Sequence, residues 1–117
     1  MYNAHVAYPI VNAKDIVTRR TVGRFAREAR LGRNLKQEMA ATALGMKGRS
    51  MITGIERGHL LPSLDLSLRM EKLYEIPRYS FCFLVAKCRV QENSAAILEE
   101  LQERGAPPLK IRIGFGS

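Results

Sequence analysis

The stretch that decides the fold is residues 45–63, which read "GMKGRSMITGIERGHLLPS". Ile52 and Ile55 are three residues apart, the spacing of two side chains on the buried face of a helix. Gly58 follows them, and glycine is the residue that most often ends a helix in the left-handed conformation. The stretch therefore predicts a short helix over about residues 49–57. A helix of this length is too short to be stable alone in water, so packing must hold it in place.

Apolar spacing predicts further helices on both sides of this stretch. We expect them over residues 21–34, 35–45, 62–77 and 78–88, with a tight turn at 46–48 and a more acidic helix over 92–105. The sequence thus predicts an all-α fold, a compact five-helix domain with an additional C-terminal helix and short tails. The residues expected in the core are Phe25, Ala40, Ala41, Leu44, Ile52, Ile55, Leu64, Leu68, Leu73, Phe81 and Leu84.

The chain is basic, and its positive charge is concentrated in the first half. It has 117 residues, enough for one domain, and a formal net charge of +8. Residues 1–62 contain 11 Lys or Arg and 4 Asp or Glu. Such clustering suits a polyanionic partner, because each cation that neutralises a phosphate releases condensed counterions. A solvated basic surface is the alternative that charge alone leaves open.

The chain divides into three expected segments. Residues 1–17 form an N-terminal tail, residues 18–90 the helical domain, and residues 91–117 a C-terminal helix and tail that can serve dimerisation or partner binding. The tails "HVAYPIV" and "LKIRIGF" can pair as strands, reach a second subunit or be disordered.

Several functional classes find no support in the sequence. No apolar run approaches the ~20 residues of a membrane span, and the N-terminus lacks the basic and apolar regions of a secretory signal. We therefore expect a cytoplasmic protein. Cys82 and Cys88 have no CxxC spacing and no nearby histidine, so we interpret them as buried or idle thiols and expect no metal or cofactor. No nucleophile, metal-protease or phosphate-loop motif is present, which argues against an enzyme.

A set of landmarks between Val22 and Leu84 occurs in a characteristic order. They are Arg30, Gln37, Ala41, Leu44, Gly45, Ile52, "IERG" at 55–58, "PSL" at 62–64 and "YEIP" at 74–77. Any one of these is common, but the ordered set is specific. It resembles the helix-turn-helix domain of phage lambda-type repressors and Cro-like regulators, the XRE family. The resemblance covers about half of the chain and implies a lambda-repressor-like fold that binds DNA.

The chain departs from the pattern of that family at three places. Ala40 stands where the family usually has Leu or Val, and Lys36 where it usually has Ser or Thr. Six residues, Met46–Met51, separate the glycine that ends the second helix from Ile52, whereas five are usual. The chain is therefore similar to a subgroup with a turn one residue longer.

The resemblance implies that the third helix lies in the major groove, with its N-terminal residues at the base edges. With both isoleucines facing the core, the expected base contacts are Arg49, Ser50, Met51, Thr53 and Gly54. Arg49 is the main candidate, because a guanidinium can bond both acceptors of guanine. Met51 can touch a thymine methyl, and Gly54 can let the helix approach DNA closely.

The resemblance also implies contacts to the DNA backbone and one internal ion pair. Gln37 matches the glutamine that bonds a phosphate and braces the third helix, and free amides at that helix start favour an anion. The expected phosphate contacts are Gln37, Lys36, Lys47, Arg33 and Arg57. Arg30 and Glu56 are expected to form a structural ion pair between the first and third helices.

These residues predict a sequence-specific regulator of double-stranded DNA, a repressor that binds a palindromic operator as a homodimer. A dimer is inferred because one short helix contacts too little DNA for high specificity. By association, the subgroup suggests a bacterial phage, plasmid or other mobile element. One alternative is an antitoxin that controls its own promoter and binds a toxin through the C-terminal tail. Another is a protein-interaction module that kept the fold without DNA binding.

Overall fold

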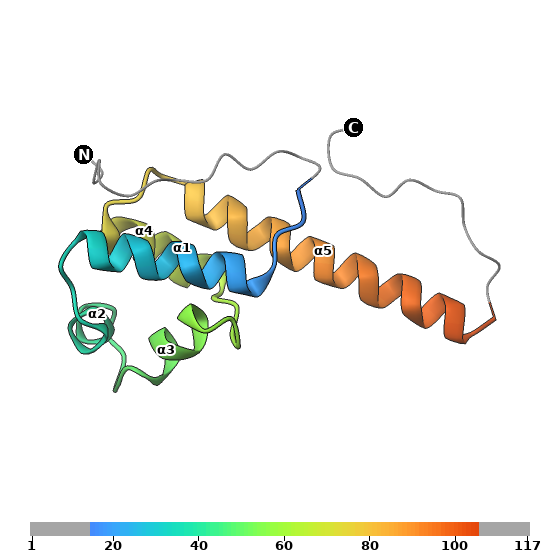
Figure 1. The fold of residues 1–117 in the computed structure, drawn as a ribbon, viewed down its shortest axis with the longest axis horizontal. Coiled ribbons are helices and arrows are strands. Elements are labelled where there is room, and N and C mark those ends of the chain that lie inside the picture. The colour runs from blue at the N-terminus through green and yellow to red at the C-terminus, as the bar shows by residue number, and fades with distance from the viewer. Residues whose placement is uncertain (1–14, 106–117) are drawn as a thin grey trace.

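The structure is a computed structural model that describes residues 15–105. Within that range the chain forms five helices and no strand, which confirms the all-α prediction (Figure 1). They are α1 (Arg19–Gly32), α2 (Gln37–Ala43), α3 (Ser50–Glu56), α4 (Leu64–Tyr74) and α5 (Ser80–Glu103).

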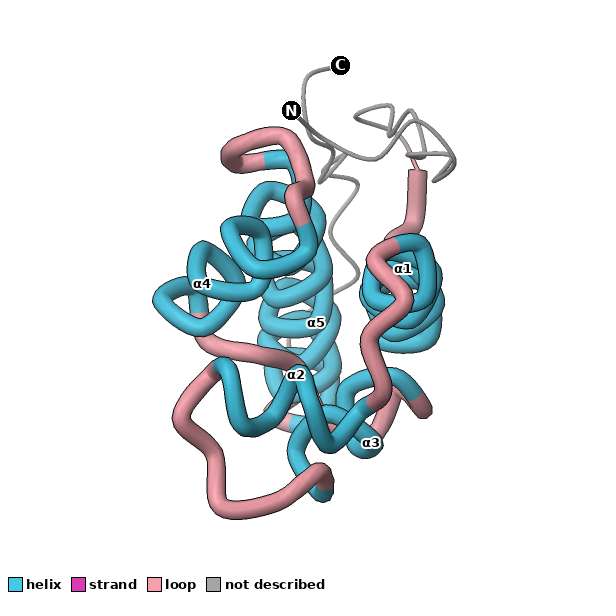
Figure 2. Tube along the Cα trace, turned by 90° about the vertical axis from the view of Figure 1, so that its left-hand side faces the viewer, coloured by secondary structure: helices cyan, strands magenta, loops and turns pink. Residues whose placement is uncertain are grey.

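The helices enclose one hydrophobic core, which is mostly aliphatic and includes three aromatic rings, those of Phe25, Tyr74 and Phe81. In Figure 2, α1 stands on one side and α4 with α5 on the other, while α2 and α3 close one end. The rings of Phe25 on α1 and Phe81 on α5 stack with their centroids 5.7 Å apart. Ile52 and Ile55 are fully buried, so the short α3 is held by packing as the sequence predicts.

Side chains and glycines fix where the helices begin and end. Thr18 Oγ1 accepts a hydrogen bond from Thr21 N at the start of α1, and Ser63 Oγ accepts one from Leu66 N at the start of α4. Gly58 follows α3 with a φ of +79°, a conformation that glycine adopts without strain.

Gly23 lets α1 and α3 approach closely. A Cβ built on Gly23 would lie 2.3 Å from the carbonyl oxygen of Ile55 and 2.7 Å from that of Glu56. Any larger residue would push the two helices apart, because the atoms in its way are backbone. The position of α3 on the domain therefore depends on a glycine in α1 that the sequence pattern does not single out.

The predicted inner face of α4 is wrong in two places. Leu64 and Leu68 are 46% and 38% exposed, whereas Ser67 and Glu71 are buried. Ser67 Oγ donates to Ser63 O at 2.7 Å, so its hydroxyl is satisfied inside the fold. The buried face of α4 therefore includes polar residues. The leucine spacing alone assigns the wrong face of the helix to the core.

Glu71 is buried because it caps the start of α5. Its carboxylate accepts hydrogen bonds from Tyr79 N at 2.7 Å and Cys82 N at 2.8 Å. Tyr79 is the N-cap residue of α5 and Cys82 lies in its first turn, where backbone N–H groups lack helical partners. A buried carboxylate is stabilised there by the bonds and by the helix dipole.

The additional C-terminal helix is the continuation of α5 rather than a separate element. No proline or glycine interrupts residues 80–103, so nothing ends the helix at the expected boundary between residues 90 and 91. Its middle is tied to the start of α1, where Val17 N donates to Gln91 Oε1 at 2.7 Å and Arg19 pairs with Glu92 at 2.8 Å. Beyond Glu92 the helix projects past the other four (Figure 1).

Some expectations concern residues outside the described range. The possible strands in "HVAYPIV" and "LKIRIGF", and the partner-binding tail, lie there. Within residues 15–105, no helix combines the length and apolarity that crossing a membrane requires.

Candidate nucleic-acid interface

The outward face of α3 borders an open groove. Its volume is about 690 Å³, and the lining comes from α1, α2, α3 and the loop after α3. The lining residues are Arg27, Gln37, Arg49, Ser50, Thr53, Gly54, Glu56, Arg57, His59 and Leu60. Residues from both sides of the predicted turn and from the third helix thus meet in one surface feature.

A buried ion pair holds the end of α3 against α1. Arg30 Nε lies 2.7 Å from Glu56 Oε2, and Arg30 Nη2 lies 2.9 Å from Glu56 Oε1. The two side chains are only 7% and 4% exposed. The hydrogen bonds to Glu56 raise the pKa of Arg30, so the guanidinium keeps its charge inside the fold.

Gln37 extends this ion pair into a network at the base of the groove. Its Nε2 donates to Glu56 Oε1 at 3.0 Å, and its Oε1 accepts a hydrogen bond from Thr53 Oγ1 at 2.8 Å. Gln37, the first residue of α2, therefore forms hydrogen bonds to two residues of α3, Thr53 and Glu56. Such a network fixes how α3 is presented to a partner.

The turn between α2 and α3 begins with a regular helix end. Gly45 has a φ of +76°, its N–H donates to Thr42 O at 3.0 Å, and Met46 N donates to Ala41 O at 2.9 Å. This pair of bonds is the Schellman arrangement, which ends a helix and redirects the chain. Arg69 of α4 also donates to Leu44 O, so the end of α2 is anchored to α4 just before the turn.

A family comparison agrees with this geometry. Residues 27–81 match the family model described as Helix-turn-helix. This part of the chain is similar to a helix-turn-helix domain. Its five-helix arrangement is lambda-repressor-like, and domains of this kind act in DNA-binding regulators. Neither a curated protein nor a solved structure matches the chain.

Three of the expected base contacts are exposed at the start of α3. Arg49 precedes the helix, Ser50 is its first residue, and both line the groove. Met51 is 44% exposed but lies outside the groove lining. These side chains are free to meet a ligand that enters along the N-terminal end of α3.

The other two expected base contacts have roles inside the protein. The hydroxyl hydrogen of Thr53 is donated to Gln37, so this residue braces α3. A Cβ on Gly54 would lie 2.6 Å from Leu60 Cδ1, and Leu60 N donates to Gly54 O at 3.2 Å. The missing side chain of Gly54 therefore accommodates Leu60, which covers the position where DNA was expected to approach.

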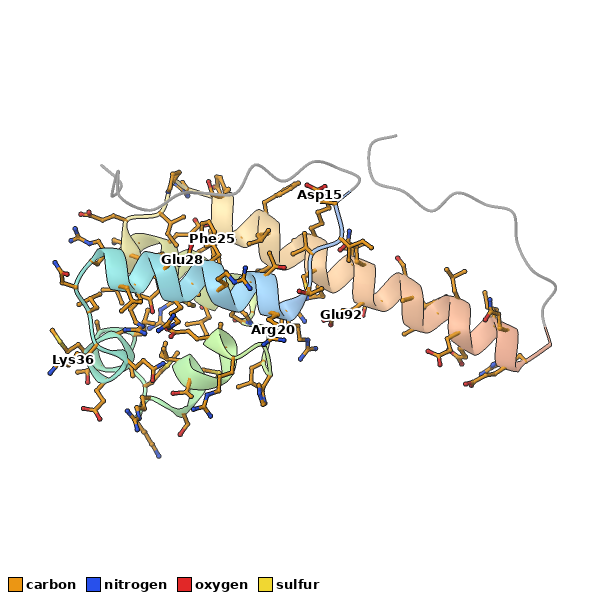
Figure 3. All side chains as sticks on the ribbon, in the orientation of Figure 1. Asp15, Arg20, Phe25, Glu28, Lys36 and Glu92 are labelled. Carbon is orange, nitrogen blue, oxygen red and sulfur yellow. The ribbon has the colours of Figure 1, made fainter. Side chains whose placement is uncertain are left out.

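The expected phosphate contacts also fall into two groups. Lys36, Lys47 and Arg57 are exposed, and Figure 3 shows Lys36 at the outer edge of α2. Arg33 instead pairs with Glu75 at 2.8 Å, so a phosphate would have to displace a carboxylate there. Gln37, the fifth candidate, has both ends of its amide engaged with α3.

Sequence reasoning missed a second hollow beside the groove. It has a volume of about 420 Å³ and is lined by Arg20, Arg24, Arg27, Glu56, Arg57 and His59. The signal is present in the sequence, because Arg20, Arg24 and Arg27 follow the i, i+4, i+7 spacing of one helix face. The amphipathic pattern alone identifies these arginines only as the polar side of α1.

The cysteines lie away from this surface. Cys88 is buried, and burial, with Glu92 next in importance, raises the pKa of its thiol to about 11. Burial also raises the pKa of Cys82. Both thiols keep their protons at neutral pH. In the part of the chain that the structure describes, no cluster of three His, Cys, Asp or Glu residues could hold a metal ion.

Proposed function

We propose that this protein is a sequence-specific regulator of double-stranded DNA that acts as a repressor. The observation that carries the proposal is the groove along α3, which presents Arg49 and Ser50 beside a basic surface while Ile52 and Ile55 anchor the helix from below. A surface of this kind offers hydrogen-bond donors to base edges and cations to phosphates.

In this proposal α3 enters the major groove by its N-terminal end. Arg49 reads guanine through two parallel hydrogen bonds, and Ser50 and Met51 contact neighbouring bases. Lys36, Lys47 and Arg57 bind phosphates on either side and set the register of the helix. The network of Arg30, Gln37, Thr53 and Glu56 supplies the rigidity that such readout requires.

We also propose that the protein binds as a homodimer through an exposed apolar face of α5 that runs from Val90 to Leu101. Val90, Ile97 and Leu101 are 43%, 57% and 40% exposed, and their spacing of seven and four residues places them on one face of the helix. A second copy of the same helix would remove these apolar side chains from water.

Charge favours an antiparallel pairing of the two helices. Glu99, Glu100 and Glu103 make the far end of α5 acidic, whereas Arg89 lies on its domain-proximal part. Antiparallel packing about Ser94 would bring the acidic end of each copy toward Arg89 of the other. A two-fold dimer would match two half-sites about 34 Å apart in a palindromic operator.

Selection of bound duplexes from a random DNA library tests the DNA-binding proposal. We expect enrichment of a site with two-fold symmetry whose half-sites contain guanine. Enrichment of a single half-site would retain DNA binding but remove the dimer. Failure to enrich any sequence, together with no retention of duplex DNA at low salt, would overturn the proposal.

The dimer surface has its own test by sedimentation equilibrium. The double variant Ile97→Glu/Leu101→Glu is expected to be monomeric, because carboxylates would replace the apolar side chains that the interface removes from water. The matched control is Ala95→Glu/Gln102→Glu, which adds the same charge on the opposite face of the helix and should remain dimeric. Equal behaviour of the two variants would exclude this face of α5 as the interface.

A further inference from the structure

The arginines on the exposed face of α1 form a row beside the recognition surface. Arg20, Arg24 and Arg27 are all exposed, and with Arg57 they line the second hollow. This hollow shares four lining residues with the α3 groove, namely Arg27, Glu56, Arg57 and His59. The two hollows therefore form one continuous basic surface that runs from α3 onto α1. Figure 3 shows Arg20 on the side of α1 that faces α3.

The pairing of arginines differs sharply between this surface and the rest of the molecule. Away from it, each arginine in residues 15–105 has a protein partner. Arg19, Arg30, Arg33 and Arg104 pair with carboxylates, Arg69 and Arg89 donate to carbonyl oxygens, and Arg78 lies over the ring of Tyr79.

The arginines that line the two hollows lack such partners among the described residues. They are Arg20, Arg24, Arg27, Arg49 and Arg57. Like charges four residues apart on a helix repel one another by roughly 0.2–0.5 kcal/mol per pair. A row of this kind is therefore slightly unfavourable until an anion neutralises it.

The nearby carboxylates do not neutralise the row. Glu56 lies at the floor of both hollows, but its two oxygens accept hydrogen bonds from Arg30 and Gln37. Glu28 is four residues after Arg24 and forms no ion pair with it in the described structure. The surface consequently offers unneutralised guanidinium groups to a ligand rather than to the protein itself.

We propose that Arg20, Arg24 and Arg27 form a second phosphate-binding track that holds the DNA backbone beyond the segment in contact with α3. This inference rests on the proposed DNA-binding function and extends it to a surface of α1. Successive arginines of the row lie about one helical turn, roughly 5 Å, apart along α1, so the row can face several phosphates of one strand, which follow at about 3.4 Å along the DNA axis. The track adds affinity on any duplex and carries no sequence information, because it contacts only the backbone.

The salt dependence of binding tests the track directly. Each phosphate contact contributes about 0.9 to the slope of log affinity against log salt concentration. The triple variant Arg20→Ala/Arg24→Ala/Arg27→Ala should therefore reduce that slope by about 2.7. The wild type should bind more tightly than the variant at about 50 mM salt, and the ratio of their affinities should fall by roughly 40-fold when salt is raised to about 200 mM. The fall should be the same on operator and on random duplex, because the track contacts only the backbone.

A matched triple variant separates contact from loss of net charge. Lys72→Ala/Arg78→Ala/Arg104→Ala removes the same charge from exposed positions on α4, the loop after it and the far end of α5. It should leave the slope close to that of wild type. Alanine is the best helix former, so the α1 variant should stay folded, which its far-ultraviolet circular dichroism can verify.

The outcomes distinguish the track from the function on which it rests. If wild type binds duplex DNA and both triple variants reduce the slope of log affinity against log salt concentration by the same amount, the track is excluded while the DNA-binding proposal stands. The track is likewise excluded if neither variant changes the slope. If wild type binds no duplex DNA at low salt, the proposed function and the track both fail.

Discussion

Arg30 Nε and Glu56 Oε2 lie 2.7 Å apart between two almost fully buried side chains, so one ion pair joins α1 to the last residue of α3. Removing one partner of a buried pair leaves the other charge without compensation, which costs on the order of 3–5 kcal/mol. We predict that Glu56→Ala loses this much free energy of unfolding, measured by urea denaturation. Arg104→Ala, which breaks the exposed pair with Glu100, should lose well under about 1 kcal/mol. Equal losses would show that burial adds nothing to the Arg30–Glu56 pair.

Gly23 sets the distance between α1 and α3. In an exposed helix interior Gly→Ala normally stabilises by roughly 0.5–1 kcal/mol. Here the new methyl group would meet the carbonyl oxygen of Ile55 at 2.3 Å, so we predict that Gly23→Ala destabilises by about 2–3 kcal/mol. Gly48→Ala is the control, since a Cβ there would have no neighbour within 4 Å. A stability for Gly23→Ala at or above wild type would contradict the close approach of the two helices.

Tyr74 carries a polar atom that the fold leaves unsatisfied. Its ring is fully buried, and its hydroxyl has no hydrogen-bond partner within the described residues. Burial, followed by the charge of Glu56, raises the pKa of this hydroxyl, so it stays protonated. We predict that Tyr74→Phe raises the thermal midpoint by removing a penalty of about 1 kcal/mol. Tyr79→Phe, at a 56% exposed ring, should change little, and a destabilised Tyr74→Phe would mean that the hydroxyl has an important partner.

The Arg19–Glu92 pair links stability to pH. The hydrogen bond from Arg19 lowers the pKa of Glu92 in the folded protein. A carboxylate with a depressed folded pKa contributes stability above its unfolded pKa and loses it as pH falls through the folded one. The stability difference between wild type and Glu92→Gln should therefore be present at about pH 7 and shrink below pH ~4. A difference that stays constant from neutral pH to about pH 3 would show that the pair is not the cause.

The sequence predicted the parts of the fold that depend on local pattern. Ile52 and Ile55 follow a helical period and are fully buried, and Gly45 and Gly58 end helices with positive φ as expected. The inner face of α4 was missed because buried Glu71 is satisfied by amides from α5, a tertiary contact that no local pattern reveals. The close approach of α1 to α3 at Gly23 is likewise a tertiary contact that no local pattern reveals.

The candidate site was predictable in outline but not in the role of each residue. Arg49 and Ser50 line the groove because they precede the anchored isoleucines. Thr53 and Gly54 lie on the same face of α3, but both make contacts within the protein. Thr53 donates a hydrogen bond to Gln37, and Leu60 packs against Gly54. Such assignments depend on which partners three-dimensional folding brings within reach. The helical spacing of Arg20, Arg24 and Arg27 can be read from the sequence. That they border the same surface as α3 depends on how α3 packs against α1.

The central claim is that the N-terminal end of α3 reads DNA sequence, and fluorescence anisotropy of labelled duplexes tests it most directly. Dissociation constants would be measured for wild type, Arg49→Ala and Lys47→Ala on the selected operator and on random duplex of equal length at one salt concentration. Losing a bidentate guanine contact costs about 1–3 kcal/mol, so Arg49→Ala should reduce the preference for operator over random duplex by roughly 5- to 150-fold. Lys47→Ala should weaken both complexes equally and leave that preference unchanged. An unchanged preference for Arg49→Ala would contradict the claim.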